Sequence, residues 1–317
     1  MAAMSQIPGS KIACALPCIL AFIAVSHAQP QQDLSPWTVG NLVVQFSNDQ
    51  RTNLAPPDPL TKSIVFNPTD DILVFDRVGA RPRKVEDGIS PALSPDGGMI
   101  AYCGVLPGIQ SSQLMLIKTD GTGKKRLTDM GGSPCSPAWS PDGMRIAFTV
   151  SSDRGQLVMV LDFRQQTISR IALGSLPRWS PDGKRLVFLR APETHGAVAS
   201  IYVADADGKH AKFIVETHAP VPSANWNFDG NSILYTDDDH HRSAIFRANL
   251  DGSHVEELAD QRNREMYYPA ISPDGKQLVV VEQDAGEFSL TLIDLATHKA
   301  QWLARGLRGE VRWVRSQ

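Results

Sequence analysis

Side chains that could ligate a metal gather most densely between residues 237 and 242, where three aspartates, two histidines and an arginine follow one another. His240 and His241 are adjacent, and adjacent histidines seldom coordinate one ion together. An acidic loop of this composition is usually a solvated surface. We therefore expect no metal site and no resident cofactor in this segment.

Nucleophilic chemistry has little support in the chain. No Gly-x-Ser-x-Gly pentapeptide occurs among the 317 residues, so the nucleophile elbow of a serine hydrolase is absent. The basic segment 121–126 contains two glycines but lacks the spacing of a phosphate-binding loop. We expect a protein without catalytic residues.

Arginine and tyrosine recur in a second segment, at Arg262, Arg264, Tyr267 and Tyr268. These residue types are enriched where proteins bind partners, because they combine large contact area with hydrogen-bonding groups. This segment is therefore a candidate binding surface.

Overall composition fits a folded protein that does not bind nucleic acid. The chain is 42% hydrophobic and 21% charged, and its formal charge is −3 with no long run of one sign. Nucleic-acid-binding proteins normally carry a concentrated basic stripe.

The N-terminus has the layout of a secretory signal peptide. Lys11 precedes an apolar run from Ile12 to Val25, and Ser26-His27-Ala28 places small residues at the positions before a cleavage site. We expect residues 1–28 to be removed near Ala28 and the mature chain, without a membrane span, to be periplasmic or secreted. An uncleaved anchor is the alternative.

A tetrapeptide repeat dominates the rest of the chain. Ser-Pro-Asp-Gly begins at Ser94, Ser140, Ser180 and Ser272, and Asn227-Phe228-Asp229-Gly230 is a degenerate copy. Proline presets φ in a tight turn, aspartate bonds to its own backbone, and glycine accepts a positive φ. Each copy lies between two short β-forming segments, so it predicts a β-hairpin.

Two further strands complete each unit. The third-strand segments are 114–117, 157–161, 201–204, 244–248 and 290–295, and three of them lead into Asp-Gly turns. Four antiparallel strands repeated about every 45 residues are typical of a β-propeller blade.

The length favours six blades rather than seven, because residues 29–317 hold six units of about 45 residues. We expect an all-β, six-bladed propeller over residues 63–317, preceded by an arm at 29–62 with one extra strand at Leu42 to Phe46. The sixth blade would be shared by the termini, with residues 311–314 as its innermost strand and 63–66, 71–75 and 82–85 as its outer strands. Such sharing would close the ring.

The hairpin order places two sets of loops on one rim of the propeller. The connections after the second strands and after the fourth strands share the side opposite the Ser-Pro-Asp-Gly turns. We expect this rim to bind a ligand; its residues are His195, His218, His240, His241, Arg242, Arg262, Arg264, Glu265, Tyr267 and Tyr268.

Three polar residues replace alanine just before the repeated turn, namely Arg178, Asn225 and Arg312. They could line the mouth of the axial channel or pair with a neighbouring blade.

Cys103 ends a second strand and Cys135 precedes the next innermost strand, so both approach the same rim. We predict a disulfide between them, with two free thiols as the alternative.

The Trp-Ser-Pro-Asp-Gly repeats resemble those of the TolB-like family of six-bladed propellers, over roughly residues 60–317. The same repeat occurs in periplasmic scaffolds, peptidase propellers and some polysaccharide lyases, so the resemblance implies a fold more than a function.

From these features we expect an exported, monomeric, non-catalytic scaffold of the cell envelope that binds a protein or other ligand at the loop rim. The alternative is a lyase or hydrolase that uses a divalent metal to act on a sugar or lactone at the axial channel.

Overall fold

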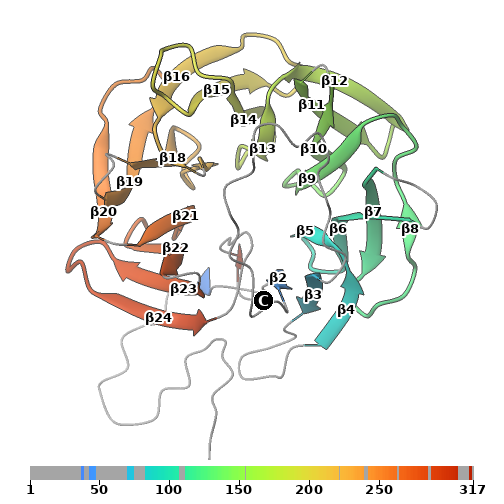
Figure 1. The fold of residues 1–317 in the computed structure, drawn as a ribbon, viewed down its shortest axis with the longest axis horizontal. Coiled ribbons are helices and arrows are strands. Elements are labelled where there is room, and N and C mark those ends of the chain that lie inside the picture. The colour runs from blue at the N-terminus through green and yellow to red at the C-terminus, as the bar shows by residue number, and fades with distance from the viewer. Residues whose placement is uncertain are drawn as a thin grey trace, which may run out of the picture.

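The structure is a computed structural model that describes residues 37–38, 43–47, 70–74, 83–106, 111–153, 155–220, 222–238, 242–262, 264–284, 287–305 and 314–315. The cleavage site and most of the expected arm lie outside these residues. Within them the chain forms only β-strands, turns and irregular connections, arranged as a ring of sheets around an axis (Figure 1).

Five sheets have four antiparallel strands each, in chain order from the axis outwards. Blade 1 contains β5 (Ile89–Leu93), β6 (Met99–Gly104), β7 (Gln113–Lys118) and β8 (Lys125–Arg126). Blade 2 contains β9 (Ser133–Trp139), β10 (Arg145–Ser152), β11 (Gly155–Asp162) and β12 (Thr167–Leu173). Blade 3 contains β13 (Ser175–Trp179), β14 (Arg185–Arg190), β15 (Ala199–Asp205) and β16 (Lys212–Thr217). Blade 4 contains β17 (Ala224–Trp226), β18 (Ser232–Asp238), β19 (Arg242–Asn249) and β20 (Glu256–Arg262). Blade 5 contains β21 (Glu265–Ile271), β22 (Gln277–Asp284), β23 (Glu287–Asp294) and β24 (Ala300–Arg305).

The propeller of four-stranded antiparallel blades is therefore confirmed. The first strands of successive blades contact one another (β5 with β9, β9 with β13, β13 with β17, β17 with β21), which places them around the axis.

The prediction of a sixth four-stranded blade shared by the termini was wrong for the described residues, which form five such blades. A sixth sheet has three strands: β2 (Val43–Ser47), β3 (Asp70–Val74) and β4 (Arg83–Asp87), with β2 next to β5 of blade 1. The segment expected as an extra strand of the arm thus takes the innermost position. The segment expected as its first outer strand, residues 63–66, lies outside the described residues.

The terminal strands do pair, but with each other. β25 (Val314–Arg315) pairs with β1 (Trp37–Thr38) as a two-stranded ribbon. β2 instead pairs with β3 over a five-residue register.

The Ser-Pro-Asp-Gly turns fold as their chemistry predicts. In blade 3 the Ser180 hydroxyl donates to Asp182 Oδ1 at 2.6 Å, and the Gly183 N–H donates to the Ser180 carbonyl at 2.9 Å, with Gly183 at φ +68°. The hydrogen bond from Ser180 lowers the pKa of Asp182, which keeps the turn carboxylate charged.

Blades adhere through shared apolar clusters. One cluster joins Ala138 and Val158 of blade 2 to Leu186 and Phe188 of blade 3, and Leu186 and Phe188 have no exposed surface. Equivalent clusters join the other neighbouring blades. No blade buries its own faces alone, so the blades depend on one another for their cores.

Tryptophan side chains form hydrogen bonds across the same junctions between neighbouring blades. The indole N–H groups of Trp139, Trp179 and Trp226 donate to carbonyl oxygens of the preceding blade, those of Ala92, Ala138 and Arg178, at 3.0 to 3.1 Å. Arg145 lies 4.3 Å over the Trp179 ring and also donates to the Gly183 carbonyl. These contacts fix neighbouring blades near the axis.

Candidate functional site

The two rims of the propeller carry different kinds of connection between strands. The turn rim carries the Ser-Pro-Asp-Gly turns and the turns between third and fourth strands. The loop rim, on the other side, carries the connections after second strands and between blades. Connections of the loop rim vary, from the short β10–β11 link to the eight residues 191–198, on a frame that otherwise repeats.

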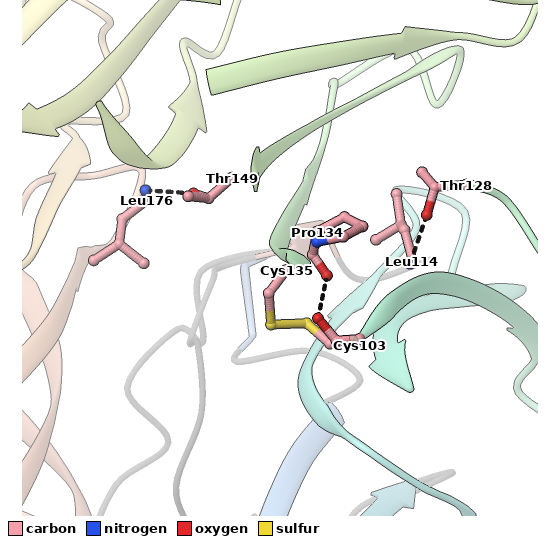
Figure 2. Close-up of a disulfide and its surroundings, with 8 residues drawn as sticks. Cys103, Leu114, Thr128, Pro134, Cys135, Thr149 and Leu176 are labelled. Atoms are coloured by element: carbon pink, nitrogen blue, oxygen red, sulfur yellow. Dashed lines mark hydrogen bonds between the residues drawn. A yellow bond between two sulfur atoms is a disulfide. The ribbon is translucent and has the colours of Figure 1, made fainter. Parts of the chain in front are cut away.

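The loop rim contains the disulfide that the topology predicts (Figure 2). Cys103 of β6 and Cys135 of β9 are joined, with their Cα atoms 5.1 Å apart, so the bond links blade 1 to blade 2. At the next junction the Thr149 hydroxyl, which is at the position of Cys103 in the repeat, accepts the Leu176 N–H at 2.9 Å. The disulfide between blades 1 and 2 therefore takes the position that a hydrogen bond takes between blades 2 and 3.

A left-handed residue precedes a proline in four of the five innermost strands. Ser90, Ser136, Leu176 and Tyr268 have φ between +51° and +52°. A β-bulge accompanies each of them. Blade 4 has Ala224 where the others have proline, and its first strand pairs without a bulge. Such bulges re-aim side chains and cost backbone strain, which concentrates at functional positions.

Arg264 lies in a fixed cluster on blade 5 and not on an open surface. It pairs with Glu282 at 3.1 Å and with Asp284 at 3.4 Å, and its guanidinium lies 5.6 Å from the Trp302 ring centroid. Glu282 is only 1% exposed, so this pair is part of the blade's structure.

Tyr267 was expected at the surface but is buried. Its hydroxyl donates to Glu265 and lies 3.1 Å from Gln283 Oε1. The adjacent left-handed Tyr268 is half-buried and donates its N–H to the Ser223 hydroxyl at 3.1 Å. The bulge in β21 interrupts the alternation of buried and exposed side chains along the strand. The sequence pattern does not show where this interruption falls.

Arg242 is also held by carboxylates. It donates to Glu257 through two nitrogens, at 2.8 and 2.9 Å, and to Asp260 at 3.1 Å. His218 also lies beside a carboxylate, with its Nδ1 3.4 Å from Asp237 Oδ1. Asp237 also accepts the His218 N–H at 2.6 Å, so it anchors the crossing between blades 3 and 4.

His195 lies exposed in the connection between β14 and β15. Glu216 holds this connection by accepting the N–H groups of Glu193 and Thr194, both at 2.8 Å, and the Thr194 hydroxyl. The hydrogen bond from Thr194 is the main cause that lowers the pKa of Glu216 to about 2. The anchored connection presents His195 and the exposed Val198 at the loop rim.

Of the residues expected to line the channel mouth or pair with a neighbouring blade, Asn225 pairs with a neighbouring blade. Asn225 donates to the Pro269 carbonyl of blade 5 at 3.1 Å. Blade 5 has Ile271 where blades 2 to 4 have tryptophan, so this amide supplies the junction bond that no indole makes there. Arg178 donates to the Pro177 carbonyl at 2.8 Å.

Several expected site residues are not placed. His240, His241 and Arg312 lie outside the described residues, and so does the side chain of Arg262. Of the expected rim, the structure describes the side chains of His195, His218, Arg242, Arg264, Glu265, Tyr267 and Tyr268, and their grouping into one binding surface stays a prediction.

Among the described residues no group of three His, Cys, Asp or Glu side chains converges as a metal would need. Likewise, no helix within the described ranges is long and apolar enough to span a membrane.

Sequence reasoning overlooked a second periodic set. His210, His254 and His298 end the turns between third and fourth strands of blades 3, 4 and 5, each with φ of +50° to +54°. Their regular spacing of 44 residues could have indicated this periodic set from the sequence. His210 Nδ1 lies 2.6 Å from Asp205, so the set lies on the turn rim as part of the turns.

Comparison with known proteins agrees with the fold. Residues 172–312 match the TolB beta propeller domain family (PD40). Among solved structures, TolB from Acinetobacter baumannii is similar with a TM-score of 0.63 and 20% identity, over 87% of this chain and 66% of that one. The putative TolB from Agrobacterium tumefaciens has a TM-score of 0.58 and 20% identity, over 71% of this chain and 84% of that one.

A curated relative shares only a segment. Dipeptidyl-peptidase 5 from Porphyromonas endodontalis is 42% identical over 85 residues, which are 24% of this chain and 12% of the peptidase. The chain thus spans a small part of the curated relatives that it matches. Residues 172–312 are therefore similar to the TolB beta propeller domain, and the fold of the chain is that of a TolB-like propeller.

Proposed function

We propose that this protein is an exported, monomeric, non-catalytic binding module of the cell envelope, whose loop rim recognises a protein or other ligand. The observation that supports it is the contrast between the rims. The turn rim repeats nearly the same turn from blade to blade, and the Ser and Asp side chains of that turn bond within it. The loop rim presents different side chains from each blade on a rigid frame, as recognition surfaces do.

The structure also changes which residues should be tested. Arg264, Tyr267 and Arg242 are engaged in buried or multiple contacts, so replacing them would disturb the blade and not only a ligand. His195 and Val198 are exposed on an anchored connection and suit a binding test.

The experiment compares two matched variants. His195→Asn/Val198→Ser changes the loop rim, and His254→Asn/Val255→Ser makes the same changes on the turn rim, where Val255 is 51% exposed. Both are used to capture partners from envelope extract beside the wild type. A partner bound by the wild type and the turn-rim variant, but at least about tenfold less by the loop-rim variant, supports the proposal. Equal capture by all three proteins contradicts it.

A hydrolase is the second candidate, favoured by the segment shared with dipeptidyl-peptidase 5. Release of 4-nitroaniline from dipeptidyl 4-nitroanilides, with and without added divalent metal, tests it. Turnover that follows the purified protein would replace the binding proposal with an enzymatic one.

A further inference from the structure

The Cys103–Cys135 bond lies at a junction that is held in two separate halves. On the side of the turn rim, the Trp139 indole donates to the Ala92 carbonyl at 3.0 Å. A buried cluster that includes Ala101, Ile146 and Phe148 packs around this contact. On the side of the loop rim, the disulfide is the covalent link, beside a hydrogen bond from the Ser112 hydroxyl to the Pro134 carbonyl at 3.0 Å (Figure 2).

The two cysteine residues differ in burial. Cys103 is 1% exposed within β6, whereas Cys135 is half-buried on the innermost strand of blade 2. Disulfide exchange begins when a thiolate attacks one sulfur along the S–S axis, so access selects the sulfur that is attacked.

We propose that the Cys103–Cys135 bond is a thiol-exchange site, which a dithiol reduces by attack at Cys135 and whose reduction loosens the loop-rim half of the junction while the propeller stays folded. The attacking thiolate forms a mixed disulfide with Cys135, and the electron pair of the broken bond leaves on Cys103, which takes up a proton. The second thiol of the reductant then releases Cys135 as a thiol and leaves as a disulfide. The protein gains two protons and two electrons, and the dithiol is oxidised.

The fold persists in this scheme because the other junctions show that no covalent bond is needed there. On the loop-rim side, the junction between blades 2 and 3 has the hydrogen bond from the Leu176 N–H to Thr149, and the junction between blades 4 and 5 has those from Tyr268 to Ser223 and from Met266 to Ser243. When the disulfide is reduced, residues 127–136 lose the covalent constraint that Cys135 imposes on them. This segment includes Ser136, whose φ is left-handed. This inference does not depend on the proposed function.

Reactivity of single cysteines tests the direction of attack. Cys103→Ser leaves Cys135, and Cys135→Ser leaves Cys103; both proteins are labelled with a maleimide under native conditions, and peptide mass spectrometry locates the label. Cys135 should react at least about tenfold faster than Cys103. Equal rates, or a faster Cys103, would overturn the assignment.

Hydrogen exchange tests the consequence. Reduction of the wild type with dithiothreitol should speed amide exchange in residues 127–136 at least about tenfold and leave the amides of Ile100 and Ile146 protected. No change in residues 127–136 would show that the bond constrains nothing. Lost protection at Ile100 and Ile146 would show that the bond holds the whole fold together, and either result refutes the proposal.

The repeat provides a control. Cys103→Thr/Cys135→Ser places at position 103 the residue type that blade 2 has at position 149. Its exchange in residues 127–136 should not respond to dithiothreitol, which separates exchange at the disulfide from other effects of the reagent.

Discussion

Each junction tryptophan carries a polar contact and an apolar one at the same position. Trp179 donates to the Ala138 carbonyl at 3.1 Å and is 8% exposed, and Arg145 lies over its ring. Trp179→Phe replaces the indole with a smaller aromatic ring and removes the donor, which leaves a buried acceptor with one partner fewer and a small cavity. We expect a loss of about 1–3 kcal/mol in the free energy of unfolding, measured by urea denaturation. Trp302→Phe, at a side chain that is 51% exposed, should stay within about 0.5 kcal/mol of the wild type.

Glu216 gives a prediction for pH. Its pKa is lowered to about 2, mainly by the Thr194 hydroxyl, from an ordinary value of 4.5. A lowered carboxylate pKa stabilises the anchored connection fully above pH 4.5, and the stabilisation is lost as pH falls through about 2. In Thr194→Val the pKa should rise toward its ordinary value, as followed by NMR titration of the Glu216 carboxyl carbon. An unchanged pKa would mean that Thr194 does not hold the carboxylate.

At the scale of elements, two left-handed glycines make a matched pair. Gly208 has φ +86°, and a Cβ there would lie 2.4 Å from the Ile171 carbonyl oxygen of blade 2. Gly196 has φ +99°, and a Cβ there would meet nothing within 4 Å. Gly196→Ala should cost about 1–2 kcal/mol from the backbone alone, and Gly208→Ala should cost more because the blades must separate. Thermal unfolding of both variants measures the difference, and equal losses would contradict this close approach.

The elements also show how far sequence reasoning reaches. Strands of blades 1 to 5 were predictable because each is tied to a local turn signal, and the observed hairpins begin and end within a few residues of the expected ones. The sheet of β2, β3 and β4 has no such tetrapeptide, so its inner strand was assigned to the wrong segment. The disulfide followed from topology alone. Burial of Tyr267 did not, because a bulge one residue away depends on the folded register.

For the whole molecule, stability is a sum of junctions between neighbours. Phe188 belongs to the cluster between blades 2 and 3, and Leu234 to that between blades 4 and 5; both are fully buried. Phe188→Ala should cost about 3–5 kcal/mol and Leu234→Ala about 2–5 kcal/mol. Their combined loss should equal the sum within about 0.5 kcal/mol, whereas Phe188→Ala with Trp179→Ala, in one cluster, should deviate from the sum. Strong coupling between the two distant sites would argue against junctions that act independently.

The indole bonds between blades all run in one direction along the chain. Trp139, Trp179 and Trp226 each reach back to an acceptor 47, 41 or 48 residues earlier, and none reaches forward. When a ribosome releases the chain, each tryptophan therefore emerges after the carbonyl it needs. Each of these indoles can therefore form its bond without waiting for the next blade. The forward bonds from Arg145, Arg185 and Asn225 must wait for the blade that follows, so each of these junctions is completed in two stages.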